Sequence, residues 1–146
     1  MKVEGLKELE KALMELDKHT ARKGVARKVL KKAGQPLADE MNRRAPIGKD
    51  ASEGLHTSYS VSTKLSKRQR KLAKRGKSDV EIYVGTSDPA GVQQEFGNVN
   101  HAAQPHVRPA WDGGKNQALE TIKDELGTEI INAVKRQTKR KLKAAK

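Results

Sequence analysis

Histidine is the residue type in this chain with the widest chemistry, and the chain has four of them. His101 and His106 lie five residues apart and close to Asp112, and histidine and carboxylate side chains together can bind zinc. A metal site on a helix would need two histidines four residues apart, with a third ligand at a recognisable spacing. Neither feature occurs. We therefore predict no metal site, and we interpret these histidines as hydrogen-bonding or packing residues of a proline-containing loop.

The other residues that could support catalysis are dispersed along the chain. The glutamates at positions 40, 53, 81 and 95 show no spacing that would pair a general acid with a general base. No serine lies in a nucleophile-elbow motif, and no glycine-rich phosphate loop occurs. The absence of cysteine excludes disulfides, thiolate chemistry and cysteine-bound zinc. We predict no enzymatic activity and no cofactor.

Positive charge is the stronger chemical signal. The chain has 31 Lys and Arg against 18 Asp and Glu, a formal net charge of +13, which favours polyanions or acidic protein surfaces as partners. Eight basic residues and no acid fall within residues 64–77, which we name the basic arm, and the C-terminal tail, residues 135–146, adds seven more. The candidate contacts to DNA or to an acidic partner are Lys67, Arg68, Arg70, Lys71, Lys74 and Arg75.

Two interpretations of the basic arm stay open. It could neutralise phosphates in a salt-dependent manner, or it could be an ordinary solvated loop. Neither the arm nor the tail contains an aromatic residue on which a base could stack. Any contact with nucleic acid is therefore expected to involve the backbone and to be non-specific.

Length and composition bound the elements that must position these residues. A chain of 146 residues is long enough for one hydrophobic core, so we expect a single domain over residues 1–146. The core should be thin, because only 34% of residues are apolar. No apolar stretch is long enough for a membrane span, and the N-terminal sequence lacks the apolar core of a secretory signal. We therefore expect no membrane contact, and a protein that works in a cytoplasm or in an assembly built there.

Helical periodicity marks both ends of the chain. Leucines at positions 6, 9, 13 and 16 predict a helix over about residues 5–18, whose stripe we assign to the core with an interface role left open. A second helix, with apolar residues every four positions from Val25 to Met41, should be kinked or divided at Pro36 and should stop before Pro46. A long C-terminal helix buries one face, made by Leu119, Ile122, Leu126, Ile130 and Val134.

The middle of the chain reads as extended. A loop over residues 46–58 leads into alternating patterns near Tyr59–Thr63 and Val80–Val84, which predict two antiparallel strands joined through the basic arm. Asp88 can cap a short helix that ends at Gly97. The predicted fold class is α+β: two N-terminal helices, a small antiparallel sheet with a long basic hairpin arm, a short helix and a long C-terminal helix.

The stretch Gln104–Trp111, with the sequence QPHVRPAW, contains two prolines and the only tryptophan. Pro105 and Pro109 should hold Gln104 and Arg108 in extended geometry, which predicts a stiff connector that ends where the long helix begins. Trp111 could anchor that helix against the sheet or a neighbouring subunit. Arg108 is either a helix-entry salt-bridge partner or a subunit contact, and we favour the contact. We expect Trp111→Ala to damage folding and Arg108→Ala to leave a folded subunit that assembles poorly.

Taken in order, these segments resemble a known family. The sequence carries Ala45-Pro46, then Gly54-Leu55 with Ser58, then Glu95-Phe96-Gly97, and finally Pro105 with Arg108-Pro109-Ala110. This order resembles the tail-completion proteins of long-tailed bacteriophages and is similar to the minor tail protein Z group of lambda-like phages. The resemblance covers nearly the whole chain.

The resemblance implies a structural virion protein at the head-proximal end of the tail, where the genome passes through. It implies a ring, most often hexameric, that helps to join tail to head and contacts the tail terminator, the tail tube or head-closure (connector) proteins, with genomic DNA in its channel. Glu95, Phe96, Arg108 and Trp111 are the residues we assign to subunit contacts or to structural anchoring. The alternative function is a small non-specific nucleic-acid-binding protein, and a hydrolase is a weaker third.

Overall fold

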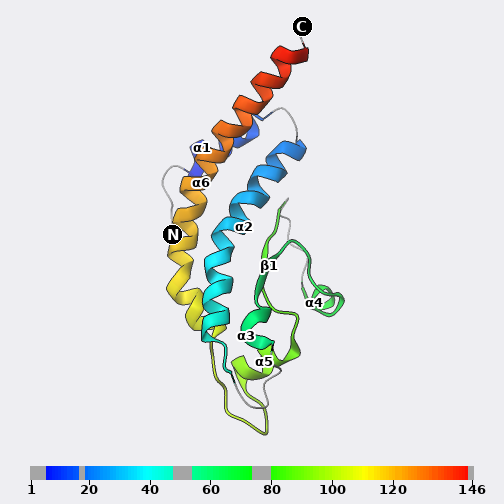
Figure 1. Cartoon of the computed structure of the whole chain (residues 1–146), viewed down its shortest axis with the longest axis vertical. Coiled ribbons are helices and arrows are strands. Elements are labelled where there is room, and N and C mark those ends of the chain that lie inside the picture. The colour runs from blue at the N-terminus through cyan, green and yellow to red at the C-terminus, as the bar shows by residue number, and fades with distance from the viewer. Residues whose placement is uncertain (1–5, 17–18, 48–53, 74–79, 145–146) are drawn as a thin grey trace.

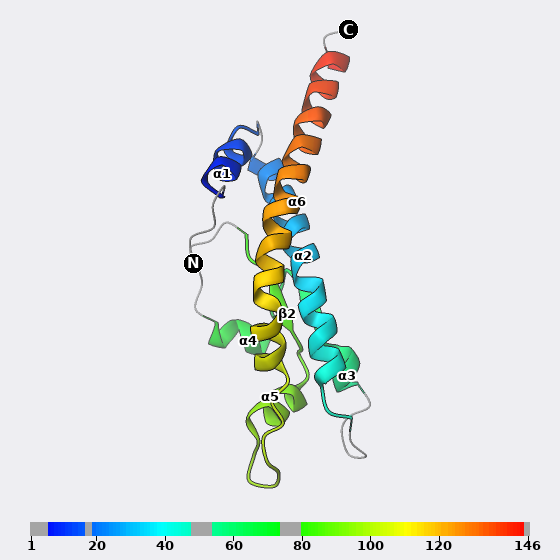
Figure 2. The same ribbon diagram turned by 90° about the vertical axis from the view of Figure 1, so that its left-hand side faces the viewer.

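Two long antiparallel helices form the body of the molecule (Figure 1). A computed structural model describes residues 6–16, 19–47, 54–73 and 80–144. Helix α2 spans His19–Arg44 and helix α6 spans Val107–Ala144, and they pack along most of the length of α2. The small sheet lies on the other side of α2, so α2 is the central layer (Figures 1 and 2). This arrangement confirms the α+β class.

Helix α2 buries the line of residues that its periodicity predicts, with Val25, Val29, Ala33, Leu37 and Met41 all inside. It ends before Pro46, as predicted. The expectation that Pro36 divides the helix is wrong, because α2 continues through it. Pro36 is exposed, so the backbone carbonyl that it leaves without a helical partner is on the side where water can reach it.

Helix α1 (Leu6–Met14) packs across α6 and closes one end of the core. Leu16 is fully buried there among Val25, Ile130 and Ala133. Leu9 and Leu13 pack against the same cluster, so these two leucines and Leu16 belong to the core, while the side chain of Leu6 lies outside the described residues. The predicted buried face of α6 fails at its last member, since Val134 is 45% exposed. Four-residue steps drift around a helix of 3.6 residues per turn, and the buried line turns instead from Ile130 to Ala133.

Strands β1 (Ser60–Ser62) and β2 (Tyr83–Gly85) form the predicted antiparallel pair, with Val61 opposite Val84. Both valines face α2 at Gly34, where an added Cβ would lie 3.0 Å from Val84 Cγ2 and 3.4 Å from Val61 Cγ1. A glycine at this position lets the sheet approach the helix closely. The valines therefore fix which face of the sheet is inside.

Two short helices complete the second end of the core. Helix α5 (Pro89–Phe96) has the predicted ends, with Asp88 Oδ1 accepting from Ala90 N and Gly97 closing it at φ 75°. The loop expected before the first strand contains helix α3 (Leu55–Ser58), which was not predicted. Together these elements enclose a cluster of buried side chains: Met41, Ala45, Leu55, Tyr59 and Ala110.

The described first half of the connection between the strands, up to residue 73, contains a helix. This helix, α4 (Lys67–Leu72), is capped reciprocally by Ser66 and Gln69. Gln69 Nε2 also donates to the carbonyl of Thr86 at 2.8 Å, which ties α4 to the end of β2. Among the residues described, no helix is both long and apolar enough to span a membrane.

Candidate functional site

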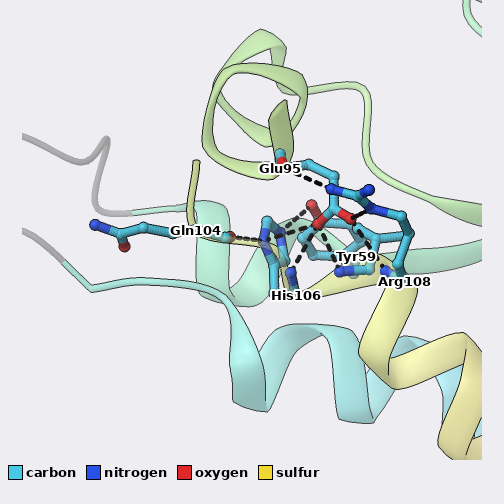
Figure 3. Close-up of polar contacts among 6 residues, drawn as sticks. Tyr59, Glu95, Gln104, His106 and Arg108 are labelled. Atoms are coloured by element: carbon cyan, nitrogen blue, oxygen red, sulfur yellow. Dashed lines mark hydrogen bonds and ion pairs between the residues drawn. The ribbon is translucent and has the colours of Figure 1, made fainter. Parts of the chain in front are cut away.

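The residues assigned to contacts from sequence lie in three places. Lys67, Arg68, Arg70 and Lys71 are on α4, while Lys74 and Arg75 lie outside the described residues. Glu95 and Arg108 meet at the junction between α5 and α6 (Figure 3). The Phe96 ring lies beside the Arg108 guanidinium. Trp111 lies one turn further along α6.

The carboxylate of Glu95 binds the first turn of α6 although it comes from α5. Its Oε2 accepts from the backbone nitrogens of His106 at 2.7 Å and Val107 at 2.8 Å. Its Oε1 accepts from Arg108 twice, from the backbone nitrogen at 3.2 Å and from Nε at 2.8 Å. The first N–H groups of a helix have no partner within the helix, and the helix dipole favours a negative charge there. Glu95 therefore serves as a cap supplied from eleven or more residues away.

The charge of Glu95 is stabilised although its side chain is buried. Burial acts to raise the pKa of the Glu95 carboxyl, but the hydrogen bonds from His106, Val107 and Arg108 outweigh it and lower the pKa to about 2. A general base needs a pKa near the working pH and free access to a proton. The geometry of Glu95 suits a structural anchor.

His106 is the second buried polar residue of this junction, at 1% exposure. Its Nδ1 lies 3.0 Å from the carbonyl oxygen of Gln104, so Nδ1 is the donor. Its Nε2 then accepts from the hydroxyl of Tyr59 at 2.6 Å, and the two rings meet edge to face at 5.4 Å. Burial raises the pKa of Tyr59 to about 12, with the charges of Glu95 and Asp88 adding to the effect, so the hydroxyl keeps its proton. This tyrosine–histidine pair explains why a histidine is buried here.

Arg108 joins the buried carboxylate to the surface. Its guanidinium carbon lies 5.1 Å from the centre of the Phe96 ring, and its terminal nitrogen donates to the Glu95 carbonyl at 3.3 Å. Both the Arg108 side chain, at 60%, and Phe96, at 66%, are largely exposed. Of the two roles considered for Arg108, the helix-entry salt bridge is the one visible within the chain.

The helix begins earlier than the prolines suggested. Arg108 was expected to be extended, but it already lies in α6, which starts at Val107. Pro109 occupies the first turn, where a missing N–H costs little. The carboxylate of Glu95 binds the N–H groups before Pro109, and this tertiary contact overrides the preference that a proline imposes on its predecessor.

Trp111 is 52% exposed and borders an apolar groove of about 420 Å³ between α2, β2 and α6. Leu30, Val84, Leu119 and Ile122 are among its walls. A half-buried tryptophan at the rim of such a groove can contact the fold on one side and a partner on the other. The geometry therefore leaves both proposed roles of Trp111 available.

The sequence interpretation missed Tyr59 as a member of the site and read α4 as a loop. No local sequence pattern connects Tyr59 with His106, because Tyr59 lies directly before β1 and His106 lies directly before α6. The start of α4 did have a signal, since Ser66 and Gln69 form the three-residue spacing of a capping box. No group of three potential metal-ligating side chains occurs in the described parts of the chain.

Three features are typical of a structural protein that contacts other macromolecules. They are exposed cations, half-exposed aromatic side chains, and a buried carboxylate that binds a helix terminus. Residues 7–97 match the family described as "Bacteriophage HK97-gp10, putative tail-component", and the chain belongs to this family. No curated protein and no solved structure matches it. Membership supports a structural role in a phage tail, in contact with other virion proteins.

Proposed function

We propose that this protein forms a ring at the head-proximal end of the phage tail and helps to join tail to head around the DNA channel. In this proposal the subunits assemble in the host cytoplasm, form a ring that is hexameric in keeping with a sixfold tail, and contact the tail tube or tail terminator on one side and head-closure proteins on the other. Family membership supports a location in the tail, and the sequence resemblance to tail-completion proteins supports a location at its head-proximal end.

The observation that carries the ring is the apolar surface exposed on a chain with few apolar residues. Trp111 and Phe96 are both more than half exposed, and the groove beside Trp111 is lined by aliphatic side chains. Monomeric proteins rarely leave a large aromatic and an apolar groove uncovered together. Contacts between different patches of identical subunits close into a ring when the rotation fits.

Charge sets a condition on such a ring. Six copies would carry about 78 formal positive charges, six times the +13 of one chain. DNA in the channel and acidic faces of adjacent proteins could both neutralise them. The four described cations of α4 are exposed and reach solvent from a helix that Gln69 holds against the sheet.

The test is a deletion of the gene in the phage that encodes this chain. Particles made without the protein should separate into filled heads and unattached tails, and infectivity should return when the protein is supplied. Normal infectious particles from the deletion would refute the proposal.

The alternative, a non-specific nucleic-acid-binding protein, rests on the exposed cations of α4. Replacing Lys67, Arg68, Arg70, Lys71, Lys74 and Arg75 by glutamine separates the two functions. If duplex-DNA affinity falls while particles assemble normally, nucleic-acid binding is favoured. Unchanged DNA affinity argues against it.

A further inference from the structure

The last part of α6, residues 131–144, borders the start of α2 through Ala133, Arg136 and Arg140, and its end extends beyond the rest of the fold. In both views of the ribbon it rises past the start of α2 and past α1 (Figures 1 and 2). Ala133 is its last buried residue, and every described side chain from Thr138 to Ala144 is exposed. Eleven residues of helix beyond Ala133 correspond to about 16 Å. The match to the family ends at residue 97, so the role of this segment does not follow from membership.

One face of this segment is apolar. Ile131, Val134, Thr138 and Leu142 follow one another at spacings of three or four residues, which places them on one stripe. Ile131 is 57% exposed, Val134 45% and Leu142 65%. The inward face at the same level is made by Ile130 and Ala133, so the stripe is not needed for packing within the chain.

The neighbouring face of this segment is cationic, and repulsion among its charges opposes helix formation. Lys135 with Lys139, Arg136 with Arg140, and Lys139 with Lys143 are like charges four residues apart. Such pairs destabilise an isolated helix. Within the described residues, Arg136 is the one of these five cations that forms an ion pair with an acid, Glu129 at 3.8 Å. Residues 130–146 contain no acid. A partner that supplies carboxylates would remove this repulsion.

We propose that residues 131–144 are a docking helix that lies in an apolar groove with an acidic rim on another protein of the tail. The chemistry favours a protein over DNA, because phosphate contacts would use the cations and leave the apolar stripe exposed. A second copy of this chain fits less well, since its apolar groove beside Trp111 has Lys115 in its wall. The inference rests on the proposed function, because it takes the partner to be a neighbour in the tail.

The test uses the full-length protein and tails purified from particles that lack it. One variant replaces the stripe (Ile131→Ser, Val134→Ser, Leu142→Ser), and a second removes the charge (Lys135→Gln, Lys139→Gln, Arg140→Gln, Lys143→Gln). Each has a matched control of exposed side chains elsewhere: Ile47→Ser, Val92→Ser, Val99→Ser for the stripe, and Lys11→Gln, Arg27→Gln, Lys31→Gln, Lys123→Gln for the charge. Circular dichroism and thermal unfolding establish that all four variants fold.

The stripe and charge variants should each bind tails at least about 10-fold more weakly than the wild type, while both controls stay within about threefold. The stripe variant should keep its affinity for duplex DNA. Loss of tail binding in the charge variant alone, or in neither variant, would overturn the docking helix. Loss of self-association in the stripe variant would instead assign the stripe to a contact with a second copy. If both variants bind tails normally but lose binding to anionic lipid vesicles, the segment would be assigned to a membrane surface. If wild-type protein fails to bind tails, the proposed function fails and not only this inference.

Discussion

Glu95 and Arg108 are joined by two hydrogen bonds to the same oxygen, one from the arginine backbone nitrogen at 3.2 Å and one from Nε at 2.8 Å. The contact fixes the end of α5 to the start of α6 across the intervening loop. It uses one carboxylate to bind a helix terminus and to orient an exposed cation, so the surface at Phe96 and Arg108 depends on a buried group.

Glu95→Gln should therefore destabilise the fold. The amide group of glutamine would place N–H donors against the N–H groups of His106, Val107 or Arg108, and the charge that binds the helix terminus would be lost. We expect the free energy of unfolding, measured in urea, to fall by about 2–3 kcal/mol. Glu40→Gln is the matched control, because the pKa of Glu40 is also lowered to about 2, by hydrogen bonds from Arg43 and then Arg44, but these pairs are at the surface. An equal loss in both variants would contradict the assignment.

The same carboxylate should make stability depend on acid. The pKa of Glu95 is about 2 in the folded chain, against an ordinary 4.5. Because the folded pKa is depressed, its contribution is complete above about pH 4.5 and is lost as the pH falls towards 2, by about 3 kcal/mol at most. Glu40 titrates in the same window, so the informative quantity is the difference between wild type and Glu95→Gln. That difference should shrink between pH 4.5 and pH 2, and a constant difference would show that the charge of Glu95 has no part in stability.

Tyr59→Phe should cost about 1–2 kcal/mol of unfolding free energy, because Nε2 of buried His106 would lose its donor. Tyr83→Phe is the control, since its hydroxyl donates to Glu81 in a half-buried position where water can replace it. Chemical denaturation of the two variants side by side gives the comparison. A smaller loss for Tyr59→Phe than for Tyr83→Phe would count against the buried pair.

Gly97→Ala should also destabilise the junction. Gly97 has a φ of 75°, and an added Cβ would lie 2.7 Å from the backbone nitrogen of Ala103. We expect a loss of about 1–3 kcal/mol. Gly113→Ala is the opposite case, because nothing lies within 4 Å of its added Cβ inside α6, and it should gain about 0.5–1 kcal/mol. Thermal unfolding should therefore shift in opposite directions, and a shift in the same direction would refute the assigned loop geometry.

How far the sequence predicts this molecule depends on whether the signal is local. Asp88, Pro89 and Gly97 specify the ends of α5 by their own chemistry, and the apolar line from Val25 to Met41 specifies the buried face of α2. The last buried residue of α6 was not predictable from the sequence of the helix itself. Whether Ala133 or Val134 is buried depends on where the neighbouring residues of the core lie.

The candidate site was less predictable, since it is made by contacts between distant segments. Glu95 and Arg108 were both selected from sequence, but the carboxylate's position at the start of α6 depends on how the loop after Gly97 folds back. The pairing of Tyr59 with His106 joins residues 47 positions apart, and no local pattern encodes it. The exposure of Ile131, Val134 and Leu142 on α6 likewise depends on how far the neighbouring helices α1 and α2 extend along α6.

The most direct test of the central claim is an image reconstruction of the intact neck of the phage that encodes this chain. We expect a closed ring of this protein, with six copies, between the last ring of the tail tube and the head, and with the cations of its subunits facing DNA or acidic neighbours. Finding the protein only in the distal tail, or finding no ring of it in the particle, would contradict the account.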